Sequence, residues 1–281
     1  MWLDLYMVVS EPESYDGIFF MCDILGFGNL IKDNSCLDVG KKLMQDMLET
    51  LKTTEKKFID SEVEHTTLWD KIKDEWSYDY KLNYYTFSDT IMIYPNINYN
   101  ISSACYMVSF KILLEVVIIL YNYFLLYHNL LIRGAMVHNN YCIIKEPFSL
   151  FGKAVVEAHE LEKDQNWGGI ILSENLIKNI INEKHLLKDL VKYDDVPIKE
   201  KGLKNDYLKS PYVVKWMDKF YTPDWDWSKI IDKISNYEIA LKVLNTMKFY
   251  YKYSNLYLAR EKTKSNTLEK SQDKPKRPVE T

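Results

Sequence analysis

Two aspartates follow apolar runs that are typical of buried strands, and this is the pattern in the chain that could do chemistry. Asp23 ends the run 17–22, GIFFMC, and Asp89 lies between the β-rich runs 82–87 and 90–94. If these strands pair, the two carboxylates face each other at about 5 Å, the spacing of neighbouring strands. Like charges at that distance are costly unless a cation neutralises them, and oxygen ligands suit Mg²⁺ or Mn²⁺. Each aspartate alone also fits a turn residue that caps its own backbone, so both interpretations stay open.

The strands that must position these aspartates are predicted from their hydrophobic pattern. The run 17–22 is apolar on both alternating faces, as in a central strand covered on both sides. The runs 82–87 and 90–94 are separated by a short polar pair, which predicts a hairpin with Asp89 at its tip. Later in the chain we predict a strand over 130–138, a tight turn at Asn139-Asn140 with a hairpin mate at 141–144, and a strand over 169–173.

The predicted helices complete an α+β fold. Apolar residues at helical spacing predict an amphipathic helix over 38–60, and an almost uniformly apolar segment predicts a buried helix over 102–127. A third helix is predicted over 152–163, with a glycine at its start that allows close backbone approach. The order of helices and hairpins predicts a central mixed or antiparallel sheet flanked by helices.

Composition divides the chain into four segments. Residues 1–13 form an N-terminal segment and residues 14–190 the main domain. The less regular segment 191–260, with a helix predicted at about 228–248, is interpreted as a helical appendage. The polar segment 261–281 is predicted to be a disordered tail, because it has too few apolar residues to bury a core.

The overall composition excludes several classes of protein. With 47% hydrophobic and 27% charged residues, the 281-residue chain is typical of a globular protein. Its 36 basic and 40 acidic residues give a net charge of −4, which disfavours nucleic acid as the main partner. The four cysteines show no paired spacing, so neither a disulfide framework nor a zinc site is expected. The sequence has no secretory signal pattern, and its longest uncharged run is just short of a membrane span, so we expect a cytoplasmic protein without membrane insertion.

Four motifs in order over residues 17–172 resemble the class III nucleotidyl cyclases. The segment 23–27, DILGF, is similar to the Asp-Ile-x-Gly-Phe signature that ends the first strand of that family and supplies a metal ligand. The segment 87–90, FSDT, resembles the hairpin tip that carries the second metal aspartate, and 132–135, IRGA, matches the start of the next hairpin. The segment 152–162, GKAVVEAHELE, resembles the family's Gly-x-x-Val-Asn-x-Ala-x-Arg-Leu helix.

The positions at which the chain departs from the family pattern indicate which members of the family it resembles most. The family's transition-state Asn and Arg positions are Val156 and Glu160 here, and neither side chain can donate a hydrogen bond to phosphate. The two positions that recognise the purine base in adenylate cyclases are Tyr85 and Ser149. In this combination the chain is most similar to the stand-alone pyrimidine cyclases of the bacterial Pycsar anti-phage system, which make cyclic UMP or cyclic CMP.

The resemblance implies a metal-assisted intramolecular phosphoryl transfer. Asp23, Asp89 and the carbonyl of Ile24 would hold two Mg²⁺ or Mn²⁺ ions per active site. The implied reaction converts UTP or CTP to the 3′,5′-cyclic monophosphate and pyrophosphate. The product would act as a second messenger in anti-phage defence and be recognised by a separate effector.

The resemblance also assigns nucleotide-binding residues. Gly26 and Phe27 would bring backbone N–H groups to the triphosphate. Arg133 would replace the missing arginine as a phosphate or ribose clamp, or else form an ordinary ion pair. Tyr85 and Ser149 are the candidates for contacting the base.

Cyclases of this family work as head-to-tail homodimers with active sites at the interface, which would give the apolar helix 102–127 a partner chain to pack against. Three alternatives remain open on the sequence. They are a purine (adenylate or guanylate) cyclase, a catalytically inactive module that senses nucleotides, and an interaction scaffold.

Overall fold

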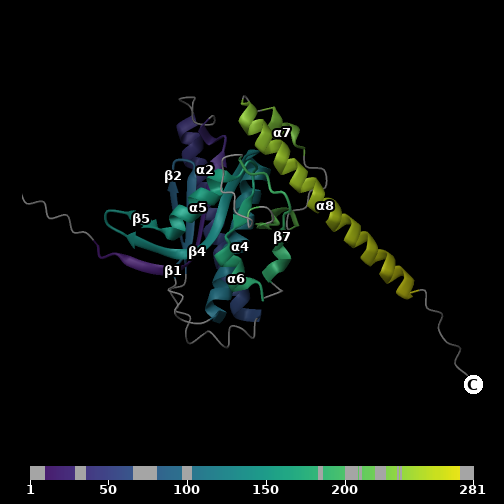
Figure 1. The fold of residues 1–281 in the computed structure, drawn as a ribbon, viewed down its shortest axis with the longest axis horizontal. Helices are drawn as coiled ribbons and strands as arrows, with labels where there is room; N and C mark the ends of the chain where they lie inside the picture. The colour runs from purple at the N-terminus through teal and green to yellow at the C-terminus, as the bar shows by residue number, and fades with distance from the viewer. Residues whose placement is uncertain are drawn as a thin grey trace, which may run out of the picture.

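Among the residues described here, eight strands form one mixed sheet at the centre of the protein (Figure 1). The computed structural model describes residues 10–28, 36–65, 81–96, 103–182, 186–199, 208, 211–218, 226–232, 234 and 236–272. The strands are β1 (Glu13–Leu25), β2 (Leu82–Phe87), β3 (Thr90–Pro95), β4 (Leu131–Ile144), β5 (Ser149–Gly152), β6 (Ile170–Leu172), β7 (Leu190–Lys192) and β8 (Tyr212–Val214). Their order is β2-β3-β1-β4-β6-β8-β7, with β5 paired to β4. Because β4 and β6 are parallel while β1 is antiparallel to both its neighbours, the predicted α+β class with a mixed sheet is confirmed.

β1 is the central strand that the sequence predicts, and it is longer than the apolar run alone indicates. It pairs with β4 over its whole length, from Glu13 opposite Ile143 to Leu25 opposite Leu131. Ile18, Phe19 and Phe20 are fully buried, because both faces of the sheet are covered at this point. The hydrophobic burial of this strand fixes its register, since a shift by one residue would exchange its two faces.

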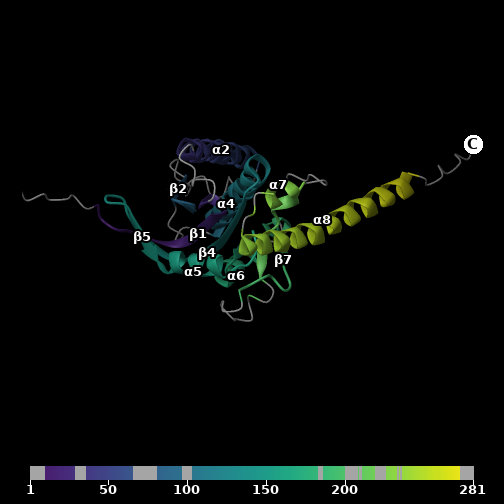
Figure 2. The same cartoon turned by 90° about the horizontal axis from the view of Figure 1, so that it is seen from above.

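Helices cover both faces of the sheet (Figure 2). α2 (Cys36–His65) and α4 (Ser103–Tyr123) contact each other and lie on one face, and α5 (Lys153–Asp164) lies on the other, against β4 and β1. The remaining helical elements are the π-helical turn η1 (Phe124–His128), α6 (Glu174–Ile180), η2 (Leu186–Asp189), η4 (Trp216–Asp218), α7 (Ser228–Ile231) and α8 (Tyr237–Gln272).

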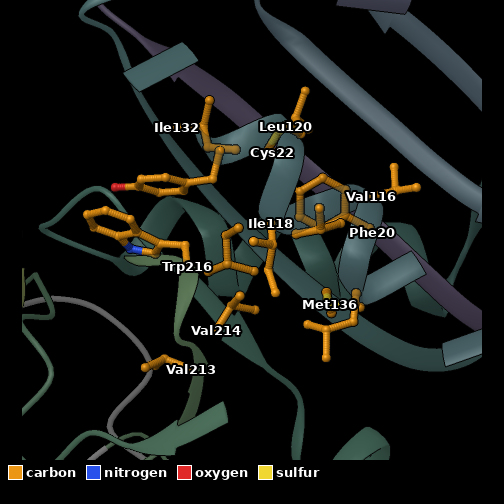
Figure 3. Packing of buried hydrophobic residues seen from close by; sticks show 14 of the residues in the cluster. Phe20, Cys22, Val116, Ile118, Leu120, Ile132, Met136, Val213, Val214 and Trp216 are labelled. Atoms are coloured by element: carbon orange, nitrogen blue, oxygen red, sulfur yellow. The ribbon is translucent and has the colours of Figure 1, made fainter. Parts of the chain in front are cut away.

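The apolar helix predicted over 102–127 is α4 with the turn η1 that continues it. Together they are long and apolar enough to cross a membrane, but 72% of the most apolar window is buried inside the protein. Figure 3 shows Val116, Ile118 and Leu120 of α4 packed among buried side chains of β1, β4 and β8. The prediction of a buried helix is therefore confirmed, and the burial lies within the core of the chain itself.

The prediction of a turn at Asn139-Asn140 is wrong. β4 continues through both asparagines, which pair with Gly17 and Asp16 of β1. The turn lies at residues 145–148, and the hairpin mate of β4 is β5. The long pairing with β1 outweighs the turn preference of asparagine, and the Asn139 side chain finds a partner in Glu157 of α5 at 3.1 Å.

The C-terminal third differs from the predicted helical appendage and tail. β7 and β8 lie in segment 191–260 or at its boundary and extend the central sheet. The helix predicted at 228–248 is divided into α7 and α8, and α8 continues to Gln272, so the chain is helical over 261–272, where a disordered tail is predicted. The first half of α8 packs against the protein, through Val243, Phe249 and Tyr250 among others, and its C-terminal part projects away in both views (Figures 1 and 2). Residues 1–9 and 273–281 lie outside the described residues.

Candidate active site

The structure brings Asp23 and Asp89 together at one end of the β1–β3 pair. Asp23 lies near the end of β1 in register with Thr90, the residue that follows Asp89. The backbone N–H of Ile24 donates to the carbonyl oxygen of Asp89 at 3.0 Å, which joins the end of β1 to the tip of the β2–β3 hairpin. Ser88 has a φ of 57°, as the first central residue of a two-residue hairpin turn requires. Hairpin geometry therefore places the second carboxylate beside the first.

Asp23 lies in a strongly negative environment. Burial, the neighbouring Asp89 carboxylate and Glu162 raise the pKa of Asp23 to about 7, while Arg133 acts in the opposite direction. The side chain remains 28% exposed, so an ion or a substrate can reach it. A bound divalent cation would offset this negative charge, and two carboxylates offer the oxygen ligands that Mg²⁺ or Mn²⁺ prefers.

The ligand set on the protein side is small. The described part of the chain contains no group of three or more His, Cys, Asp and Glu side chains that could hold a metal ion. An ion bound by Asp23 and Asp89 would therefore complete its coordination with backbone carbonyls, water or substrate phosphates. Sites that work on nucleoside triphosphates hold Mg²⁺ in this way, through one or two carboxylates plus substrate oxygens.

Asp23 belongs to a row of residues that are in register on four neighbouring strands. The register places Phe87 of β2, Thr90 of β3, Asp23 of β1 and Arg133 of β4 directly beside one another. Side chains in register on neighbouring strands point to the same face. This is the face that α5 covers, because Ala135, two residues after Arg133, packs in the cluster that includes buried residues of α5.

Tyr85 lies on the same face, one row away from Asp23. It is opposite Met92, which is opposite Met21, two residues before Asp23 on β1. Its ring stacks on Phe148, with the ring centroids 3.6 Å apart and the planes inclined by 13°, and it also lies beside Tyr94. Because β3 lies between β2 and β1, two strand spacings of roughly 5 Å and one row of roughly 7 Å separate the two backbones, which gives about 12 Å. Tyr85 therefore shares a face of the sheet with Asp23 without being its direct neighbour.

Ser149 is connected to Tyr85 through Phe148. It is the first residue of β5, in register with Ile144 of β4, and it follows Phe148 in the chain. The two residues that the resemblance selects for base contact are thus linked through Phe148, which stacks on Tyr85 and precedes Ser149 in the chain. Phe148 itself is a residue that the sequence analysis missed.

The turn after β1 exposes backbone rather than side chains. Gly26 has a φ of 87°, a conformation that favours glycine, and a Cβ built on it would meet no atom within 4 Å. The side chains of Phe27 and Ile24 are buried in the core. Phe27 and Ile24 can therefore contribute to a nucleotide or metal site only through their backbone N–H and carbonyl groups.

Arg133 is close to Asp23, but its environment differs from that of a free phosphate clamp. The residue is 7% exposed. Its Nε donates to Oε1 of Glu162 at 2.6 Å, its Nη1 donates to the carbonyl oxygen of Gln165 at 3.1 Å, and its Nη2 also contacts Glu162. Nη2 lies 3.9 Å from Oδ2 of Asp23. The arginine is thus a buried cation behind the aspartate.

Glu162 is the second residue that the sequence analysis missed. It is 4% exposed near the end of α5, on the stripe that also buries Ala154, Ala158 and Leu161. A carboxylate on the buried stripe of an amphipathic helix requires a partner, and this was the signal in the sequence. Val156, in contrast, points away from the core and is exposed.

A cavity of about 380 Å³ adjoins this site at Gly26. It is lined by Leu25, Gly26 and Leu131 on the sheet side and by Ile230 and Val243 on the side of α7 and α8, and its further lining includes the polar residues His128 and Asn129. Neither aspartate lines it, and its walls are mostly apolar. The open carboxylate face, rather than this cavity, has the groups that could do chemistry.

The solved structures that this fold resembles include adenylyl cyclases and guanylyl cyclase domains. No protein-family model matches the chain. No curated protein matches it.

Three of the similar structures illustrate the likeness. The adenylyl cyclase CyaB from P. aeruginosa has 14% sequence identity and a TM-score of 0.47, over 73% of this chain and 95% of that chain. The monomeric guanylyl cyclase domain of the RhoGC fusion protein from the aquatic fungus Blastocladiella emersonii has 15% identity and a TM-score of 0.41, over 73% of this chain and 98% of that chain. The guanylate cyclase domain of RhGC from Catenaria anguillulae, solved in complex with GTP, has 16% identity and a TM-score of 0.40, over 72% and 97%. At such identities the likeness concerns the arrangement of the chain and not its substrate.

Proposed function

We propose that this protein is a nucleotide cyclase that uses divalent metal ions. The observation that carries the proposal is the convergence of Asp23 and Asp89, joined by the hydrogen bond from Ile24 N–H to the Asp89 carbonyl. The pKa of Asp23, raised by burial and by Asp89, indicates negative charge that a cation would neutralise. The motif 23–27 and the hairpin tip 87–90 support the same interpretation, since both aspartates occupy the metal-ligand positions of the cyclase signature.

The proposed reaction joins the ribose 3′ oxygen to the α-phosphorus of a nucleoside triphosphate and breaks the bond from that phosphorus to the bridging oxygen. The 3′-hydroxyl loses its proton, and pyrophosphate leaves. Divalent ions, when bound, lower the pKa of that hydroxyl and stabilise the charge on the phosphates. Asp23, Asp89 and the Ile24 carbonyl hold the ions, and the backbone of Gly26 and Phe27 faces the triphosphate.

We propose a pyrimidine base, in UTP or CTP, as the substrate preference. Support comes from Tyr85 and Ser149, which replace the purine-recognising residues of adenylate cyclases. The aromatic pair of Tyr85 and Phe148 offers a flat surface on the face of the sheet that carries Asp23, two strands and one row away from it, against which a base can stack. The resemblance to Pycsar cyclases extends the proposal to a second messenger of anti-phage defence, which a separate effector binds.

A homodimer that closes the site is part of the proposal. Phe87, in the same row as Asp23, is 78% exposed. A second copy of the chain that closes the site would bury this ring and so supply apolar contact at the interface. Light scattering on the purified chain tests this part, because an active, strictly monomeric protein would exclude a site shared between two copies.

The product of the reaction identifies the function directly. The purified protein is incubated separately with UTP, CTP, ATP and GTP in the presence of Mn²⁺ or Mg²⁺, and the products are measured by mass spectrometry. A cyclic pyrimidine monophosphate from the wild type, absent with Asp23→Asn, is the expected result. A cyclic purine product would retain the mechanism and overturn the proposed base preference.

A nucleotide-sensing module is the second candidate function. It is favoured by Val156 and Glu160, which stand where the cyclase family has its transition-state Asn and Arg. Calorimetric titration of the same four nucleotides separates the two functions. Nucleotide binding without any cyclic product, with or without metal, would favour the sensing module.

A further inference from the structure

The Arg133 guanidinium is held on three sides, and only the weakest of its contacts is with Asp23. Two of its nitrogens contact Glu162, one of them at 2.6 Å, and a third donates to the Gln165 carbonyl at 3.1 Å. The contact with Asp23, at 3.9 Å, is longer than a hydrogen bond. The cation therefore contributes charge to the site without occupying the carboxylate oxygens of Asp23.

Without Glu162, the carboxylate nearest to the Arg133 guanidinium would be that of Asp23. Asp23 is directly opposite Arg133 in the β1–β4 register, so its carboxylate is within reach of a small side-chain rotation. Arginine and carboxylate pair through two parallel hydrogen bonds when geometry permits. Such a pair would use the oxygens that a divalent cation needs.

We propose that Glu162 is a positioning residue of the metal site: by anchoring Arg133, it keeps the guanidinium from pairing with Asp23 and leaves that carboxylate available to a divalent cation. This inference rests on the proposed function, because it concerns metal binding at Asp23. Glu162 touches no substrate in this assignment and acts only through Arg133.

The loop that binds Arg133 beside Glu162 is itself held in place by hydrogen bonds. The Gln165 side chain donates to the carbonyl oxygens of Gly134 and Leu161, at 2.8 and 3.0 Å, so the loop whose carbonyl binds Arg133 is itself fixed to β4 and α5. α8 fixes the same loop further along, through the hydrogen bond from Gly168 N–H to Thr246 Oγ1 at 2.7 Å. Glu162 is the carboxylate to which the guanidinium hydrogen-bonds, since its other hydrogen-bond acceptor is the uncharged carbonyl of Gln165.

Direct measurement of Mn²⁺ binding tests the proposal independently of catalysis. The probe is Mn²⁺ itself, titrated into the full chain and followed by electron paramagnetic resonance of the free ion, with thermal unfolding recorded in parallel. In Glu162→Gln we expect the apparent Kd for Mn²⁺ to rise about 10-fold, the lower end of the effect of residues that orient metal ligands. In the double variant Arg133→Gln/Glu162→Gln, the affinity should return to that of the wild type or exceed it, because no cation is left to compete.

Glu157→Gln is the matched control. Glu157 lies on the same helix, is partly buried and bonds Asn139 rather than Arg133, so its variant should bind Mn²⁺ as the wild type does. If Glu162→Gln does not fold, the double variant still tests the proposal, since it leaves no buried charge without a partner. Weaker Mn²⁺ binding in the double variant than in the wild type would overturn the inference, because Glu162 would then support the site without acting through Arg133.

The inference and the proposed function fail in different ways. A wild-type protein that binds Mn²⁺, with a folded Glu162→Gln variant of equal affinity, overturns the inference and leaves the function in place. A wild-type protein that binds no Mn²⁺, even with a nucleoside triphosphate present, contradicts the proposed function and the inference together.

Discussion

Asp23 and Arg133 lie opposite each other on β1 and β4, with 3.9 Å between Oδ2 and Nη2, yet the arginine gives its hydrogen bonds to Glu162 and Gln165 instead. The aspartate is therefore beside a buried cation and still open to another ligand. Burial first of all raises its pKa to about 7, and the Asp89 and Glu162 carboxylates add to this shift while Arg133 opposes it, so that three acids surround a single guanidinium. This charge imbalance is the physical basis for expecting a divalent cation at the site.

Replacing Asp23 with Asn should abolish activity and leave the fold intact. Because even a residue behind a metal ligand affects activity or affinity roughly 10–100-fold, loss of the ligand itself should reduce product formation by at least about 100-fold. Mass-spectrometric product assays measure the activity, and circular dichroism checks the fold. Asp16→Asn is the control, since Asp16 lies on the same strand with a largely exposed side chain and should retain activity.

Tyr85 should affect base preference through its hydroxyl and through its ring separately. Tyr85→Phe keeps the stack on Phe148 and removes the hydroxyl, so it should change the relative rates with the four triphosphates more than the total activity. Tyr85→Ala removes the ring and should weaken nucleotide binding, by about 1–3 kcal/mol if a base stacks on it. Competition assays with equimolar triphosphates measure the preference. An unchanged product ratio in both variants would remove Tyr85 from the site.

Local pattern predicts the part of the site that lies on one strand and one hairpin. Asp23 and Asp89 could be found from the sequence because each follows a run that is recognisable as a strand, and hairpin geometry then places them together. Glu162 and Phe148 could not be placed in the same way. Their partners, Arg133 and Tyr85, are distant in sequence, and only the completed sheet brings them into contact.

The errors in the predicted fold have the same origin. Asn139-Asn140 resembles a turn when neighbouring residues alone are considered, but β1 offers both asparagines strand partners. β7 and β8 are as short as β6 but lie in the less regular segment after residue 189, where polar and apolar residues are mixed, so no strand is recognisable before β6 provides an edge for β8. Tertiary pairing overrides local preference in both places.

Gly134→Ala should destabilise the protein, because β1 and β4 approach too closely at this residue for a side chain. A Cβ at Gly134 would lie 2.6 Å from Cys22 Cβ and 2.7 Å from the Met21 carbonyl oxygen. Crowding of this kind costs about 1–3 kcal/mol in the free energy of unfolding, which chemical denaturation measures. Gly28→Ala is the matched control, since its Cβ would meet nothing within 4 Å and the variant should be nearly neutral. Equal losses in the two variants would contradict the close approach.

His138 should make the protein less stable on acidification. Burial lowers the pKa of His138 from its ordinary value of 6.5, and the Asp16 carboxylate only partly opposes this. Because the unfolded chain then binds more protons than the folded one, stability that is present above about pH 6.5 is lost as the pH falls toward the folded pKa. Urea unfolding at pH 7.5 and pH 5.5 measures the difference, which should be smaller in His138→Gln. The same pH dependence in both proteins would exclude this histidine as a source.

Thr246 should contribute to stability through one hydroxyl that joins α8 to the loop behind Arg133. Its Oγ1 accepts the hydrogen bond of Gly168 N–H at 2.7 Å and donates to the Lys242 carbonyl at 2.7 Å, and the residue is fully buried. Thr246→Val keeps the shape of the side chain and leaves the Gly168 N–H without its acceptor, which costs about 1–3 kcal/mol. Thr246→Ser keeps the hydroxyl and loses a methyl group, which costs about 0.8 kcal/mol.

The order of these two losses is the test of how α8 is attached. Chemical denaturation should show a larger loss of unfolding free energy for Thr246→Val than for Thr246→Ser. The Gly168 carbonyl also accepts a hydrogen bond from Tyr121 of α4 at 2.8 Å, so the loop stays fixed on one side in both variants and the fold should persist. If Thr246→Ser were the more destabilised variant, apolar packing rather than the hydroxyl would attach α8 to the loop. In that case apolar contacts, and not the hydrogen bond to Gly168, would hold α8 against residues 165–168, the loop that also binds Arg133.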